Sequence, residues 1–229
     1  MNNNRRGLSR RQFITALMVG GTIPFLGATA CGRSVTTPCI VTPSQTEGPF
    51  YPVTEQLDVD NDLTFILGQE GIPEGQILFV KGQVLDAQCQ PVEGARLEIW
   101  QASARGRYHH PLDESNPIPL DKNFQGWGST VSDQEGRYVF KTVRPGQYPA
   151  APGWIRPSHI HFKVTRVGYS VLTTQMYFAG DPHLELDRIF QALRPDEWPQ
   201  VVVDTMVSGP GFPTGSVVYY FPIVLPALF

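Results

Sequence analysis

The chain has 229 residues, which is enough for one domain of ordinary size with a substantial core, and its formal charge is −3 at pH 7. Hydrophobic residues make up 41% of it, which excludes a disordered chain despite 22 glycines and 21 prolines. An acidic protein binds nucleic acid and anionic membrane surfaces poorly, so we expect neither as a partner.

The first 30 residues are typical of an export signal rather than of the fold. Ser9-Arg10-Arg11-Gln12-Phe13-Ile14 has the twin-arginine pattern, and an apolar run from Ala16 to Ala30 follows it without an acidic residue. The run is short and broken by Gly, Thr and Pro, which argues against a membrane span. Removal of residues 1–30 takes away four arginines and no acidic residue, and so moves the formal charge of the protein from −3 to −7. We therefore expect a mature protein in the periplasm or at the cell surface.

Two ways of processing this signal stay open. Ala28-Thr29-Ala30 fits cleavage after Ala30, whereas Cys31 fits a lipoprotein site at which the cysteine becomes the acylated N-terminus and anchors the protein by lipid. The two other cysteines, Cys39 and Cys89, either form a disulfide, which an oxidising compartment permits, or remain two free thiols. The sequence alone does not supply the geometry that decides this.

Residues 31–76 are expected to form an extended N-terminal arm. Within the arm, Thr42–Pro52 holds three prolines and a glycine, which exclude regular structure. This segment should therefore lie over a surface of the fold or against a partner.

From residue 77 onward, short patterns typical of β-strands recur between turn signals such as Asp133–Gly136 and Val143–Gly146. Strands are predicted at Ile77–Leu85, Ala95–Gln101, Gly126–Ser132, Arg137–Thr142, Ser158–Thr165, Val171–Phe178, Val201–Val207 and Val217–Leu225, and one short helix around Glu185–Leu193. Residues 77–229 are therefore predicted to form an all-β domain, a β-sandwich of transthyretin-like (prealbumin-like) architecture with long functional loops and little helix.

The motif richest in chemistry is Arg156-Pro157-Ser158-His159-Ile160-His161-Phe162. On a strand, His159 and His161 point to the same face about 7 Å apart, so they can converge on one metal ion. Tyr108 and Tyr148, each just after a turn, can add two phenolates, and that set of ligands suits ferric iron. A copper or zinc site at the two histidines, and an amphipathic strand with a wet polar face, remain as alternatives.

The order of several motifs resembles a known enzyme family. Trp100-Gln101-Ala102 leads into Gly106–Pro111, Pro145–Pro149 leads into Trp154–Phe162, and Thr174–Phe178 precedes Gly180-Asp181-Pro182. From roughly Thr42 to Leu225, these pieces resemble the intradiol ring-cleavage dioxygenases, and most closely the iron-binding β subunit of the protocatechuate-cleaving members.

This resemblance implies one non-haem Fe(III) per chain, held by Tyr108, Tyr148, His159 and His161. It implies that Arg156 is a catalytic residue that stabilises negative charge on the substrate ring. It also implies that Gln175 is a substrate-binding residue, acting through hydrogen bonds close to the ligands. The implied reaction adds both atoms of O2 to a catechol-type ring, of protocatechuate or a related catechol, and yields a cis,cis-muconate.

Three features depart from the family pattern. Cys89 stands where many members have a turn glycine, which is consistent with a Cys39–Cys89 bridge. Ala150 stands where the protocatechuate enzymes tend to carry tryptophan, which predicts a roomier pocket. No α-type partner subunit is visible in this chain, so such a partner and a homo-oligomer both stay open.

The stretch from Val80 to Tyr148 also resembles small transthyretin-like modules, which leaves a non-catalytic extracellular binding domain as the alternative function.

Overall fold

The structure is a computed structural model that describes residues 39–53, 58–206 and 211–228. The predicted export signal and Cys31 lie outside the described residues. No helix within the described ranges is long and apolar enough to span a membrane.

The first sheet is built around β1 (Ile77–Leu85), whose bounds are those predicted. Its other strands are β4 (Arg137–Val143), which is antiparallel to β1; β11 (Val217–Tyr220) and β12 (Ile223–Val224), which are parallel to β1; and β10 (Thr205–Met206), which pairs with β11. Alternate residues of β1 are buried, so one face of this sheet forms half of the core.

The second sheet has five strands in the order β3-β2-β7-β8-β9. They are β3 (Trp127–Val131), β2 (Arg96–Trp100), β7 (His159–Thr165), β8 (Leu172–Phe178) and β9 (Val202–Val203). β2 is antiparallel to β3 and β7, β7 is antiparallel to β8, and β9 is parallel to β8.

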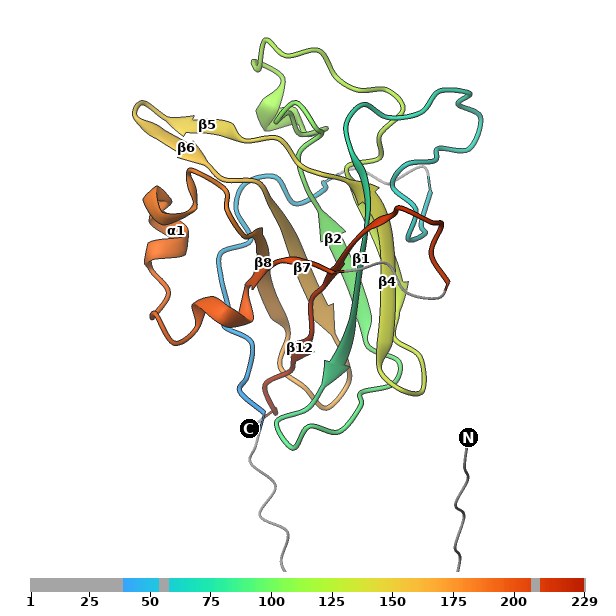
Figure 1. Ribbon diagram of the computed structural model, residues 1–229, viewed down its shortest axis with the longest axis vertical. Coiled ribbons are helices and arrows are strands. Elements are labelled where there is room, and N and C mark those ends of the chain that lie inside the picture. Colours follow the sequence, from blue (N-terminus) through green and yellow to red (C-terminus); the bar gives the residue numbers. More distant parts are fainter. Residues whose placement is uncertain (1–38, 54–57, 207–210, 229) are drawn as a thin grey trace, which may run out of the picture. The chain divides into compact units, whose positions relative to one another are not determined.

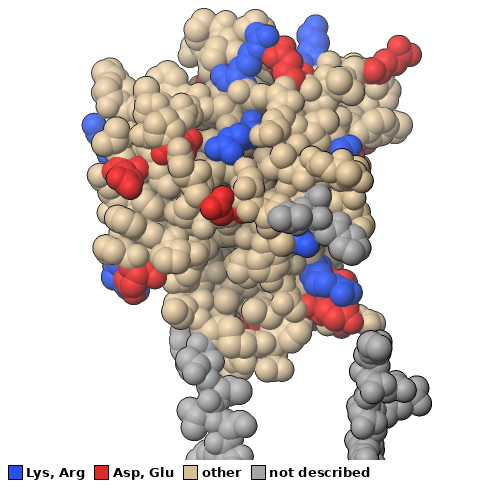
Figure 2. Space-filling model, in the orientation of Figure 1, with Lys and Arg blue, Asp and Glu red and all other residues tan. Residues whose placement is uncertain are grey.

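The two sheets pack face to face, and this confirms the predicted β-sandwich (Figure 1). Their facing sides supply fully buried apolar side chains, among them Leu78, Val80, Phe140, Ile99, Ile160 and Phe162. Among the described residues, helical structure is limited to α1 (Arg188–Gln191) and the short 3-10 turns η1 (Pro111–Asp113), η2 (Leu184–Leu186) and η3 (Trp198–Gln200). On the face shown in Figure 2, charged residues of both signs are scattered without a continuous patch of either.

Three local predictions need correction. The strand expected at 201–207 breaks at Asp204 into β9 and β10, and that expected at 217–225 breaks at Phe221-Pro222 into β11 and β12. A proline has no N–H to donate to a ladder, which accounts for the second break. The helix expected around 185–193 is divided at Asp187, which ends η2 and caps α1. Val207 itself lies outside the described residues.

A small hairpin was not predicted. It consists of β5 (Tyr148–Ala151) and β6 (Trp154–Arg156), which form a two-stranded sheet with each other. Pro149 and Pro152 favour a loop in the sequence, but a two-stranded hairpin has free edges on which a proline is tolerated. The hairpin matters because it places Tyr148 opposite Arg156.

Residues 45–51 of the N-terminal arm cross the outer face of the second sheet, that is, the face turned away from the core. The Gln45 N–H donates to Thr173 O of β8 (2.8 Å), the Lys163 ammonium of β7 pairs with Glu47 (2.9 Å), and the Tyr51 hydroxyl donates to Glu98 of β2 (3.1 Å). These contacts confirm the prediction that residues 42–52 lie over a surface.

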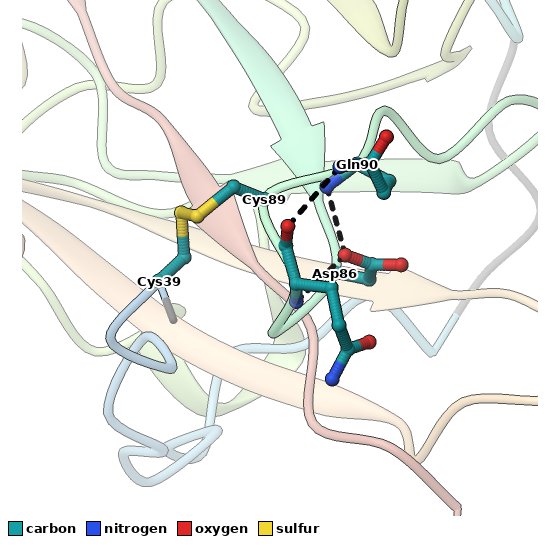
Figure 3. The surroundings of a disulfide bond; sticks show 5 residues. Cys39, Asp86, Cys89 and Gln90 are labelled. Carbon is teal, nitrogen blue, oxygen red and sulfur yellow. Dashed lines mark hydrogen bonds between the residues drawn. A yellow bond between two sulfur atoms is a disulfide. The ribbon is translucent and has the colours of Figure 1, made fainter. Parts of the chain in front are cut away.

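Cys39 and Cys89 form a disulfide with a Cα–Cα distance of 5.3 Å, which ties the arm to the turn after β1 (Figure 3). Asp86 organises this turn, since its backbone N–H donates to Gln90 O and its carboxylate accepts from the Gln90 N–H (2.8 Å). Cys89 has φ +63°, the left-handed conformation that favours glycine. The bridged residue thus occupies a position at which glycine would be less strained.

Candidate metal centre

Strand β7 delivers two histidines to the outer face of the second sheet. Ile160 and Phe162 point into the core and are fully buried, whereas His159 and His161 point the other way. Both histidines are only 2% exposed, because the arm and loops cover them. Their Nε2 atoms lie 3.2 Å apart, which confirms that they share a face and converge.

Two loops with the same Gly-x-Tyr pattern, Gly106-Arg107-Tyr108 and Gly146-Gln147-Tyr148, bring in the tyrosines. The loops pack back to back: a Cβ on Gly106 would lie 2.2 Å from Gln147 O, and a Cβ on Gly146 would lie 2.4 Å from the Gly106 nitrogen. Only glycine fits such a close approach. The glycines therefore set the distance between the two tyrosine loops.

The four predicted ligands meet at one place. The Tyr108 hydroxyl lies 3.5 Å from His159 Nε2, and the rings of Tyr108 and Tyr148 are edge to face with centroids 5.5 Å apart. Tyr148 is only partly buried, whereas Tyr108 is 3% exposed. The site thus has three enclosed donors and one that faces its margin.

His159 directs a nitrogen lone pair at this place, where Nε2 of His161 also points. His159 Nδ1 lies 2.7 Å from Pro157 O, which can only accept, so Nδ1 carries the proton and Nε2 the lone pair. Burial, and then the positive charge of Arg156, lower the pKa of both histidines well below its ordinary value. His161 Nδ1 is buried without a hydrogen-bond partner among the described residues. Neutral imidazoles in this arrangement fit a metal ion.

The tyrosines need a cation before they can ionise. Burial, and then Tyr148, raise the pKa of Tyr108 well above its ordinary value, and burial also raises the pKa of Tyr148, while Arg156 opposes both shifts. A trivalent metal ion at this place would supply the missing positive charge. In the part of the chain that the structure describes, no group of three or more His, Cys, Asp or Glu side chains could hold a metal, so a metal here would depend on the tyrosines.

Arg156 lies beside these donors and is 4% exposed. Its Nε donates to Asp187 Oδ2 (3.0 Å) and its Nη2 donates to Gln175 Oε1 (2.6 Å). Its backbone pairs with Tyr148 across β5 and β6, which makes the two residues cross-strand neighbours. The guanidinium therefore brings a fixed positive charge to the tyrosine side of the site.

Gln175 is fully buried on β8, opposite His161 in the strand register. Its amide accepts from Arg156 and donates to Thr46 O of the arm (3.0 Å). The structure thus places Gln175 close to the ligands as predicted, where it orients Arg156. Its role in binding substrate remains a prediction.

The arm also supplies the cover of the site. The Phe50 ring stacks on Tyr108 with centroids 4.4 Å apart and meets Tyr148 edge to face at 6.2 Å. Trp100 lies flat against the His161 ring at 4.8 Å. Aromatic surfaces therefore enclose the donors and exclude water from much of the site.

Sequence reasoning assigned no role to two buried aspartates that hold the site together, although Asp181 lies in one of the motifs that carry the resemblance. Asp181 accepts from Gln147 Nε2 (2.9 Å) and from the Ser158 N–H (2.9 Å), so it joins the Tyr148 loop to the start of β7. Asp187 binds Arg156. The repeated Gly-x-Tyr pattern was a usable signal for the two loops, whereas no local pattern marks the partners of either aspartate.

A cavity of about 640 Å³ lies beside the β5–β6 hairpin. Ala150 and Trp154 line it, together with Leu186 and His183 from the region of η2. The small Ala150 side chain borders this cavity, and a roomier substrate pocket at this position remains a prediction.

Fold and site together define an all-β enzyme whose candidate centre would bind a metal through two tyrosines and two histidines. The family model described as "Dioxygenase" matches residues 46–226, and the chain belongs to the intradiol ring-cleavage dioxygenase family.

Individual relatives agree with this assignment. The chain is 42% identical to the protocatechuate 3,4-dioxygenase beta chain of Burkholderia cepacia over 163 residues, which cover 70% of this chain and 67% of the relative. It is 33% identical to catechol 1,2-dioxygenase of Candida albicans over 62% of this chain and 49% of that protein, and so spans about half of the latter's length. The solved dioxygenase domain of a carbohydrate-binding fusion protein from Streptomyces sp. SirexAA-E is 27% identical, with a TM-score of 0.59 over 82% of this chain and 100% of that one.

Proposed function

We propose that this protein is an exported, Fe(III)-dependent intradiol dioxygenase that uses O2 to open a catechol-type ring, of protocatechuate or a related catechol, to a cis,cis-muconate. One observation carries the proposal: four side chains with the donor atoms that suit ferric iron converge on the outer face of the second sheet, and they are Tyr108, Tyr148, His159 and His161. One iron per chain would occupy this place.

Bound ferric iron would hold the two oxygens of a deprotonated catechol and draw electron density from its ring, so that the ring itself reacts with O2. His159 and His161 suit the role of fixed, neutral ligands because they are enclosed on a strand. Tyr148 is the partly buried donor and begins the small hairpin, so among the four residues that would hold the iron it is the one nearest to an incoming substrate. Its phenolate would be placed to accept a proton from the substrate hydroxyl.

Arg156 supports the same reaction through charge. A fixed guanidinium in an enclosed site stabilises negative charge on ring oxygens at little reorganisation cost. Arg156→Ser should therefore lower kcat/KM about a hundredfold while the iron content stays intact. Arg156→Lys should restore only part of the activity, because an ammonium lacks the planar arrangement of donors. Wild-type turnover in Arg156→Ser would remove this residue from the catalytic site.

The test of the proposed activity is oxygen uptake by the iron-loaded protein across a panel of catechols, with identification of the product. We expect uptake of one O2 per ring opened and no uptake by the zinc-loaded protein. Binding of catechols without oxygen uptake would instead favour the transthyretin-like binding module. Activity with copper but not with iron would overturn the choice of metal.

We also propose export by the twin-arginine route, to the periplasm or cell surface. The Arg10-Arg11 pair supports it, and so does the Cys39–Cys89 disulfide, because disulfides persist in oxidising compartments. Replacing both Arg10 and Arg11 by lysine should leave the precursor in the cytoplasm. Normal export of that variant would point to the general secretory route.

Anchoring and assembly are proposals of the same kind. If Cys31 carries a lipid, Cys31→Ser should move the protein from the membrane fraction to the soluble one, and an unchanged distribution would favour cleavage after Ala30. Because the Burkholderia relative is named a beta chain, an α-type partner or further copies of this chain are proposed to accompany the site. The mass and activity of the chain purified alone decide between them.

A further inference from the structure

Asp187 is a buried carboxylate to which neither the sequence analysis nor the family assignment gives a role. It is fully buried, and its two oxygens serve different partners. Oδ2 accepts from Arg156 Nε at 3.0 Å, whereas Oδ1 accepts from Trp154 Nε1 (3.2 Å) and from the Ile189 N–H (3.1 Å), the latter as the cap of α1. One carboxylate therefore joins the helix, the hairpin and the arginine.

The ion pair with Asp187 and the hydrogen bond to Gln175 together occupy two of the three guanidinium nitrogens of Arg156. Asp187 holds Nε, and Gln175 holds Nη2 with an amide whose own orientation is fixed by Thr46 O. Within the described ranges, Nη1 makes no hydrogen bond. A guanidinium is planar, so fixing two nitrogens also fixes the direction of the third.

Burial explains why a counter-ion is needed here. The side chains of Arg156 and Asp187 are 5% and 0% exposed, and an unpaired buried charge is costly. Without the carboxylate, the guanidinium would gain by turning toward water or toward Tyr148, its cross-strand neighbour. With it, the positive charge can remain beside the tyrosines and still offer Nη1 to a ligand.

We propose that Asp187 is a positioning residue, which holds Arg156 so that its free Nη1 edge meets the negative charge that develops on the substrate ring. This inference rests on the proposed function. Asp187 does not itself touch the reacting atoms, and its effect on the reaction passes through Arg156.

Asp187→Asn separates this role from helix capping. Asparagine caps helices as well as aspartate does, so its oxygen can keep the contacts to Ile189 and Trp154. Its NH2 group would then replace Oδ2 and face the Nε–H of Arg156. Because both groups are hydrogen-bond donors, the contact to Arg156 would be lost. Asp187→Ser is the second variant, because serine also caps a helix but brings no donor of fixed direction and no charge.

The experiment is a double-mutant cycle of Asp187→Asn with Arg156→Ser, in which iron content, kcat and KM are measured on an active catechol. We expect Asp187→Asn alone to lower kcat about 10- to 100-fold, with iron retained and KM little changed. In the Arg156→Ser background it should change kcat less than twofold. Asp133→Asn is the matched control, since Asp133 pairs with Arg137 at an exposed turn, and it should be neutral.

The outcomes separate the two proposals. A wild-type protein that opens no catechol overturns the proposed function, and this inference with it. With an active wild type, full activity of Asp187→Asn, or an equal loss in both backgrounds, overturns the positioning role alone. If Asp187→Asn does not fold, the same cycle is run with Asp187→Ser, with the same criterion.

Discussion

The two faces of the second sheet are both buried, but by different means and with opposite chemistry. The inner face meets the first sheet through apolar side chains such as Ile160 and Phe162. The outer face carries Trp100, His161 and Gln175 in one row across β2, β7 and β8, and it is buried only because the arm and loops cover it.

This difference separates what stabilises the fold from what serves the site. Apolar burial on the inner face stabilises the sandwich directly. Polar groups on the outer face lose water on burial and need partners, yet Nε2 of His159 and Nε2 of His161 face each other at 3.2 Å. The outer face is therefore arranged for a ligand rather than for stability, and neighbouring residues of β7 should respond differently to substitution.

The largest contrast is expected within β7. His159→Ala and His161→Ala should each abolish iron binding and activity, because each removes one of two facing nitrogen donors. Ile160→Ala should cost about 2–5 kcal/mol of unfolding free energy through an emptied core position, yet keep its iron. Metal analysis and urea unfolding of the three variants measure both quantities. A full complement of iron in both histidine variants would remove the basis of the site.

A second prediction concerns the contact between the tyrosine loops. Gly106→Ala should destabilise the protein by about 1–3 kcal/mol and lower its iron content, because the new Cβ would meet Gln147 O. Gly153→Ala is the control: Gly153 also has a positive φ, but nothing lies within 4 Å of its Cβ position, so the cost is strain alone, about 1 kcal/mol. Equal losses of stability and of iron in both variants would contradict this account of the loops.

The smallest expected difference is between two ways of replacing the disulfide at the anchor of the arm. Removing the disulfide by Cys39→Ala with Cys89→Ala should cost about 2–5 kcal/mol. Cys39→Ala with Cys89→Gly should recover about 1 kcal/mol of that loss, since position 89 has φ +63°. Thermal unfolding of the two double variants under identical conditions measures the difference. A glycine variant no more stable than the alanine variant would exclude strain at this turn.

Much of the fold could be predicted because the strands obey a local period. β1 matched its predicted bounds, and most other strands agreed within one residue at each end. The β5–β6 hairpin was missed because its prolines favour a loop. The breaks at Asp204 and Phe221-Pro222 were missed because the apolar pattern continues through them.

The site was predictable where chemistry is local and not where it depends on contacts distant in sequence. The spacing of His159 and His161 on one strand is a local signal, and the structure bears it out. Asp187 is 31 residues from Arg156, and no sequence pattern near either residue predicts that they pair. The cover formed by Phe50 is equally non-local, since the prolines of the arm indicate extended structure but not where it lies.

The central claim is that the outer face holds ferric iron through both tyrosines. The most direct test is the visible absorption spectrum of the iron-loaded protein, compared with those of Tyr108→Phe and Tyr148→Phe at known iron content. Phenolate bound to ferric iron absorbs strongly in the visible range, so we expect a red-brown wild type and a band that weakens or shifts in each variant. A wild-type spectrum that both variants retain at full activity would contradict the account.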